Sequence, residues 1–176
     1  MKKIIIMILL FVVILPSQVL AATSTSYVDK MYFESYKERV KEVKVAQKKL
    51  NDIYCTDVKA LTEKSKASTK RYNSAVKNKA TSKEVLANAK AERDLDKKSL
   101  SSAKSKCSAT VKELKKKSDK ALREIASYKT KVVKTIKTHL DGKDKLTEND
   151  FTKSVSQSLS EIESKFDAIL GSLNAS

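Results

Sequence analysis

Two cysteines, Cys55 and Cys107, are the only thiols in this 176-residue chain. A pair of cysteines in an exported protein typically forms a disulfide, whereas a zinc site needs more closely spaced ligands and the chain has no CxxC motif. Each cysteine lies 26 residues from Thr81. If the chain folds back on itself at Thr81, the two thiols lie at the same height on facing helices. We therefore expect an intrachain disulfide.

The other residues with catalytic chemistry are scattered. His139 is the only histidine, and its position favours a cation at the C-terminal end of a helix over a general base. Asp94 and Asp96 are two residues apart, so they point to different helix faces and do not form an acid–base pair. The two glycines are far apart, which excludes a glycine-rich phosphate loop. We expect no enzymatic activity and no cofactor.

The segment from 139 to 151, HLDGKDKLTENDF, resembles the calcium-binding loop of an EF-hand, because Asp141 and Asp150 fall where loop acids would lie. The departures are large. Lys143 takes a ligand position, Asp144 replaces the turn glycine, and the bidentate glutamate is missing. We interpret the segment as a loop between two helices and predict no metal site.

The densest basic run in the chain is KELKKKSDK, from 112 to 120, in which the basic residues are Lys112, Lys115, Lys116, Lys117 and Lys120. One interpretation is a site for an anionic partner such as a sulfated glycan, lipopolysaccharide, extracellular nucleic acid or acidic lipid. The other is a solvated face that keeps a helical protein soluble. Scattered lysines and few arginines favour the second interpretation, and no motif predicts specific nucleic-acid readout.

The N-terminus reads as a secretory signal peptide. Lys2 and Lys3 precede an apolar run over 4–15, and the stretch PSQVLAA follows it. This run is shorter than the roughly 20 residues of a membrane-spanning helix, so an uncleaved anchor is the less favoured alternative. We predict that residues 1–21 are removed after Ala21. The mature chain, 22–176, then carries 35 basic and 21 acidic residues, a net charge of +14, and is secreted, or periplasmic in a Gram-negative host.

The mature chain is predicted to be helical because no proline or glycine occurs between Pro16 and Gly142 and apolar residues recur at spacings of three and four. The spacing of Thr81 and Glu84 is that of a capping box, which starts a helix. We expect helices over 27–79 and 82–140, joined by a turn; the alternative is one continuous helix. Cys55 lies beside this apolar stripe and not on it.

A third helix is predicted over 148–173, where apolar residues make the cleanest heptad stripe in the chain. It can fold back along the second helix as far as Leu114. The expected fold is all-α: a long antiparallel helical hairpin, or coiled coil, with the C-terminal helix packing on its base as a three-helix bundle. The base comprises 27–50, 112–140 and 148–173, and a two-helix arm comprises 51–111. Together they form a single elongated domain.

These expectations define a class of function. A basic, disulfide-linked helical rod is typical of a secreted, non-enzymatic coiled-coil structural or interaction protein. Its helix faces would bind a protein partner or a second copy. The alternative is a basic binding module for an anionic extracellular partner. A lipid carrier that opens at an interface is a third class, disfavoured because a disulfide resists opening and the apolar stripes are narrow.

Overall fold

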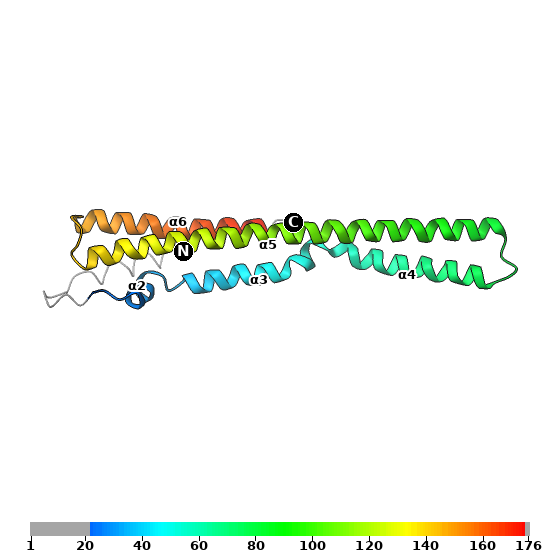
Figure 1. The fold of residues 1–176 in the computed structure, drawn as a ribbon, viewed down its shortest axis with the longest axis horizontal. Helices are drawn as coiled ribbons and strands as arrows, with labels where there is room; N and C mark the ends of the chain where they lie inside the picture. Colours follow the sequence, from blue (N-terminus) through cyan, green and yellow to red (C-terminus); the bar gives the residue numbers. More distant parts are fainter. Residues whose placement is uncertain (1–21, 175–176) are drawn as a thin grey trace.

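The computed structural model describes residues 22–174, and the predicted signal peptide lies outside them. The described residues form no strand and five helices: α2 (Thr25–Tyr32), α3 (Tyr36–Tyr54), α4 (Thr56–Lys77), α5 (Lys83–Leu140) and α6 (Glu148–Asn174). Figure 1 shows an elongated molecule in which α3, α5 and α6 lie together at one end and α4 lies along α5 at the other. The predicted all-α hairpin with a third helix on its base is confirmed.

Helix α5 organises the fold, because its 58 residues run along the whole molecule, about 87 Å at 1.5 Å per residue. The turn before it uses Asn78, whose side chain accepts a hydrogen bond from Ala80 N–H at 3.0 Å and whose carbonyl accepts one from Thr81 N–H at 3.0 Å. Ser82 caps α5 by accepting a hydrogen bond from Val85 N–H at 3.2 Å. The cap predicted at Thr81 is wrong by one residue, because the backbone of Thr81 belongs to the turn.

The single helix predicted over 27–79 is wrong, since α2, α3 and α4 share this range. The first interruption is at Phe33, where φ is −129° and the side chain is buried in the core. In a continuous helix Phe33 would point about 100° away from Tyr32 and off the apolar stripe. The break lets Phe33 and Tyr36 both pack inward.

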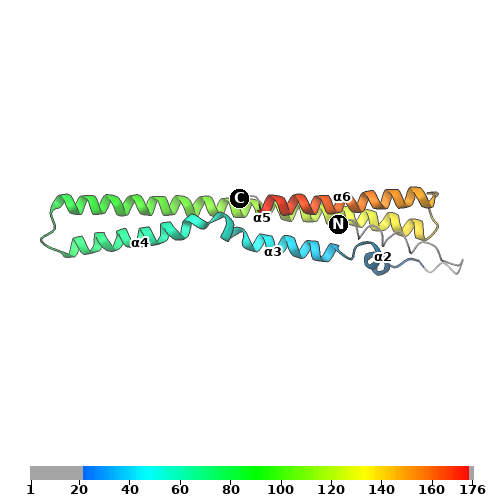
Figure 2. The ribbon, with the colours of Figure 1, turned by 180° about the vertical axis from the view of Figure 1, so that it is seen from behind.

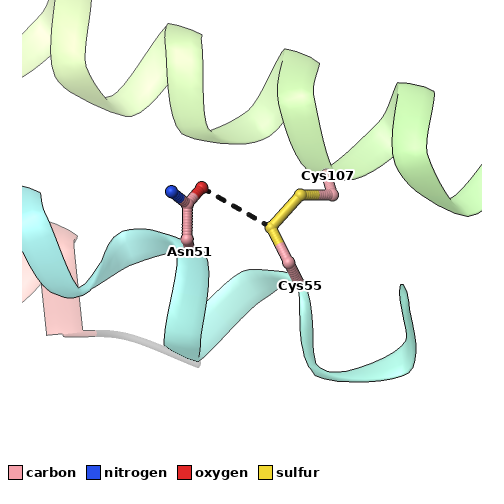
Figure 3. Close-up of a disulfide and its surroundings, with 3 residues drawn as sticks. All are labelled: Asn51, Cys55 and Cys107. Atoms are coloured by element: carbon pink, nitrogen blue, oxygen red, sulfur yellow. Dashed lines mark hydrogen bonds between the residues drawn. A yellow bond between two sulfur atoms is a disulfide. The ribbon is translucent and has the colours of Figure 1, made fainter. Parts of the chain in front are cut away.

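The second interruption is at Cys55, where the backbone leaves helical geometry at φ −118° and ψ 20°. Tyr54 lies on the apolar stripe, so an uninterrupted helix would hold Cys55 at the edge of the interface. The break between α3 and α4 brings Cys55 to face Cys107 on α5 (Figure 3). The need to reach Cys107 is the physical reason for this departure from the predicted helix.

In the structure the disulfide marks the boundary between base and arm. From here on, the base therefore means residues 22–55 and 107–174. In the base α6 lies against both α3 and α5 (Figure 2). Phe166 of α6 is 0 % exposed and makes a T-shaped contact with Tyr36 at a centroid distance of 5.5 Å. The buried apolar residues of the base are Val28, Phe33, Val43, Ala46, Leu50, Val111, Ile125, Val132, Val133, Ile136, Phe151, Val155, Ile162, Phe166, Ile169 and Leu173.

We define the arm as residues 56–106, which form α4, the turn and the first part of α5. None of the buried apolar residues of the described chain lies in the arm. The arm residues that are buried are Ser65, Ser68 and Asp96. Helix α4 and the facing part of α5 therefore meet through small and polar side chains.

Candidate interaction surfaces

The disulfide lies at the boundary between the base and the arm. The sulfurs of Cys55 and Cys107 lie at bonding distance, with Cα atoms 5.3 Å apart, within the usual range for a disulfide. Figure 3 shows Asn51 beside the bridge, and its amide oxygen lies 3.8 Å from Cys55 Sγ. The two thiols thus face each other, as their equal spacing from the turn predicts.

Three of the five predicted anion-binding lysines share a surface. Lys112, Lys115 and Lys116 line a shallow groove of about 610 Å³ together with Arg123. Asn51 at the C-terminal end of α3 lines the same groove, so it lies between α3 and α5 beside the disulfide. We call this the base groove. It brings four cationic side chains and the carboxylate of Asp119 together along one face of α5.

The other two predicted lysines are engaged elsewhere. Lys117 Nζ lies 2.6 Å from Glu113 Oε1, and the hydrogen bond and charge of Lys117 lower the pKa of Glu113. Lys120 Nζ lies 3.8 Å from Glu124 Oε1. Residues on one helix share a face only at suitable spacings, so a dense lysine run is divided among several faces. The structure therefore does not bring the five lysines into one site.

A second groove, of about 560 Å³, runs along α4 in the arm. We call it the arm groove. Its cations are Lys66, Lys70 and Lys77, of which Lys66 pairs with Glu63 at 2.9 Å. Within residues 22–174, Lys70 and Lys77 have no carboxylate oxygen within 4 Å. The rest of the lining is Thr62, Ser65, Thr69, Asn73, Ser74 and Leu100.

Sequence reasoning missed the arm groove, although spacings of four and seven place Lys66, Lys70 and Lys77 on one helix face.

Net charge also differs between the arm and the base. The arm carries 14 basic and 6 acidic residues, a net charge of +8, and the base carries 21 and 15, a net charge of +6. The shorter arm therefore holds more than half of the net charge of residues 22–174.

Asp96 is a buried acid between the helices of the arm. It is 2 % exposed, its Oδ1 lies 3.2 Å from Lys64 Nζ, and its Oδ2 has no hydrogen-bond partner in the described structure. Asp94 is exposed and pairs with Arg93 at 2.6 Å. The two carboxylates lie on different faces, as predicted, so they do not form an acid–base pair.

His139 joins the end of α5 to the loop that leads into α6. Its Nδ1 lies 2.9 Å from Asp144 Oδ1, its Nε2 lies 3.3 Å from Glu148 Oε2, and its ring stacks on Phe151 at 3.9 Å. Desolvation lowers the pKa of His139, but hydrogen bonds and charges from Asp144 and Glu148 outweigh it and raise the pKa above 6.5. Two acids of the loop that resembles an EF-hand are thus turned toward His139.

The described residues contain no group of three or more His, Cys, Asp or Glu side chains that could hold a metal ion. Within the same residues, no helix is long and apolar enough to cross a membrane. Comparisons with protein-family models, with curated proteins and with solved structures found no match to this chain. The function is therefore inferred from the two grooves, the arm and the base alone.

Proposed function

We propose that this chain is an exported, non-enzymatic helical interaction protein in which the base is the folding unit and the arm presents a binding surface. The observation that carries the proposal is the distribution of the core. All buried apolar side chains of residues 22–174 lie in the base, while the arm buries two serines and an aspartate. The arm thus adds length, charge and surface without adding apolar core.

The exposed apolar residues of the arm support a protein partner or a second copy of the chain. Val76 and Val85 lie on either side of the turn at the tip and are 52 % and 54 % exposed, and Leu95 is also exposed. Apolar side chains exposed at the end of a projecting element are typical of contact sites. Sedimentation at high concentration tests self-association, and a chain that stays monomeric directs the search to a different protein.

An armless variant tests the division of labour. Because the Cα atoms of Cys55 and Cys107 are 5.3 Å apart, a short glycine linker can replace residues 56–106 and close the base as a helix–loop–helix. We expect this variant to stay helical and to unfold cooperatively, but to lose any association that the full chain shows. A variant that no longer folds would show that the arm belongs to the folding unit, and the proposal would then be wrong.

A second candidate function is binding of an anionic extracellular partner, and the two lysine-lined grooves favour it. The arm groove combines ammonium groups with hydroxyl and amide side chains. These groups suit a sulfated glycan. Nucleic acid is bound in part by aromatic stacking, and lipid binding requires a broad apolar face; the lining of the arm groove has no aromatic residue and one leucine.

The first test of this candidate compares the salt concentration that elutes the mature protein from heparin with that from a sulfonate resin of matched charge. Later elution from heparin is expected for an organised site, and equal elution would reject it. Matched variants then locate the site. The arm-groove variant changes three lysines to Gln: Lys66, Lys70 and Lys77. The base-groove variant changes three others to Gln: Lys112, Lys115 and Lys116. Both variants lose three charges, so an equal loss of heparin affinity would mean that heparin binding depends on net charge alone.

A further inference from the structure

The base end that lies opposite the arm tip joins the start of the described chain to the loop between α5 and α6 (Figure 1). Asp141 makes this contact. Its Oδ1 accepts a hydrogen bond from the backbone N–H of Thr23 at 2.8 Å, across a sequence separation of 118 residues. Its Oδ2 lies 3.1 Å from Lys143 Nζ, and its side chain is 9 % exposed. Both carboxylate oxygens are therefore partnered at the point where the described chain begins.

Both partners in this contact are fixed by the fold. Asp141 follows the last residue of α5, and Gly142 adopts a positive φ of 65°, which turns the chain into the loop. On the other side, the hydroxyl of Ser24 caps α2, and Val28 in that helix is fully buried. Thr23 is thus held between a helix cap and the carboxylate, and it does not need to move to keep the contact.

The predicted cleavage after Ala21 creates a new α-ammonium group on Ala22, the residue directly before Thr23. Thr23 N lies 2.8 Å from Asp141 Oδ1, and successive backbone nitrogens are no more than about 4 Å apart, so the new cation arises within about 7 Å of the carboxylate. Hydrogen bonds from Thr23, followed by Lys143, lower the pKa of Asp141 to about 2, which keeps the carboxylate ionised. Before cleavage, the same nitrogen of Ala22 is a neutral amide.

We propose that Asp141 is the binding site for the α-ammonium group of Ala22, so that removal of the signal peptide locks the start of the mature chain onto the α5–α6 loop. The ligand class is a primary ammonium at a chain start. The precursor has the hydrogen bond but lacks this charge, and cleavage adds an ion pair to the base end. This inference rests on the export step of the proposed function and is independent of the arm and its partner.

A double-mutant cycle on the mature chain tests the site. One change is Asp141→Asn, which keeps an oxygen acceptor for Thr23 N–H but removes the charge. The other is acetylation of the Ala22 amine, which removes the cation in place. We expect Asp141→Asn to lower the Tm of the free-amine chain at least twice as far as that of the acetylated chain. The difference should shrink in high salt, because salt screens an ion pair near the surface.

Asp144→Asn is the matched control, because it removes a charge from the same loop and its loss of Tm should not depend on acetylation. Equal losses for Asp141→Asn in both chains would overturn the proposal and leave the proposed function standing. If Asp141→Asn does not fold, the acylation rate of the Ala22 amine in the unchanged chain is compared with that in a peptide of residues 22–27. A slower rate in the protein supports the site, and an equal rate overturns it. An exported chain that does not begin at Ala22 by intact mass overturns it as well.

Discussion

The base and the arm are built from the same kind of helix but are stabilised differently. In the base, α2, α3, α5 and α6 surround a core that includes Phe151, Phe166 and Ile125. In the arm, the two helices enclose Ser65, Ser68 and Asp96. Helical periodicity therefore does not by itself imply an apolar core. The arm is held by contacts that are individually weak and by the disulfide at its root.

The energies of these contacts differ in scale. Burying a large apolar side chain contributes roughly 1.5–3 kcal/mol. Exposed ion pairs, such as Arg71 with Glu92 in the arm, contribute about 0–1 kcal/mol. We therefore expect stability to be concentrated in the base.

The largest effect is expected from Phe166→Ala. Phe166 is fully buried, contacts Tyr36 edge to face and lies 5.7 Å from the guanidinium of Arg39. Removing a buried phenyl ring leaves a cavity and typically costs about 3–5 kcal/mol. Urea unfolding followed by circular dichroism should show this loss.

The matched arm variant is Tyr72→Ala. Tyr72 is half-buried, and its ring lies 4.0 Å from the guanidinium of Arg93, an interaction of about 0.5–1 kcal/mol at an exposed site. We expect this loss to be a fraction of that for Phe166→Ala. Similar losses at the two positions would contradict the division between base and arm.

The second prediction concerns the disulfide. It closes a separation of 52 residues, which corresponds to about 4 kcal/mol in the chain-entropy model. A Cys55→Ser and Cys107→Ser double variant should lose hydrogen-exchange protection at arm amides, because the arm has no apolar core to replace the link. Amides in α6 should keep most of their protection.

Two results would contradict this account of the disulfide. One is an equal loss of protection in α6 and in the arm, which would mean that the bridge stabilises the molecule as a whole. The other is the finding of two free thiols in the denatured, exported protein by alkylation and intact mass. In that case the arm would be held without a covalent link.

The sequence predicts the helices and their order because periodicity and the absence of Gly and Pro are local properties. It does not predict the breaks at Phe33 and Cys55, because each depends on a partner distant in sequence: the base core for Phe33 and Cys107 for Cys55. The sequence also offers an anion site in the densest lysine run as the alternative to a solvated face. The structure divides that run because charge density along a chain does not place side chains on one face, whereas the spacing of Lys66, Lys70 and Lys77 does.

A buried apolar side chain can be added to the arm at Asp96. Asp96→Leu replaces a buried carboxylate. One oxygen of this carboxylate has no partner, and the other pairs with Lys64, which is largely exposed. Removing one partner of an ion pair is costly where it leaves the other charge buried. Lys64 is 61 % exposed and would stay in solvent, so we expect a gain of about 1–2 kcal/mol here. Hydrogen exchange at arm amides should slow accordingly.

The matched control is Asp94→Leu, at an exposed position on the same helix, where a change within about 0.5 kcal/mol is expected. If Asp96→Leu instead destabilises the arm, then Asp96 and Lys64 contribute net stability. The polar interior of the arm would then stabilise it directly.

The smallest expected effect lies at the loop of the base. The folded-state pKa of His139 is raised above its ordinary value of 6.5, since Asp144 and Glu148 outweigh desolvation. Its contribution to stability is therefore fully present below pH 6.5 and is lost as the pH rises through the folded-state pKa. His139→Gln should remove this pH dependence. A free α-amine ordinarily has a pKa of about 7.7–8.0, so the comparison is made on chains with an acetylated N-terminus. The unchanged chain and His139→Gln could instead lose the same Tm between pH 6 and pH 9. The charge of His139 would then add no stability to the loop, and the main contact of His139 would be its stacking on Phe151.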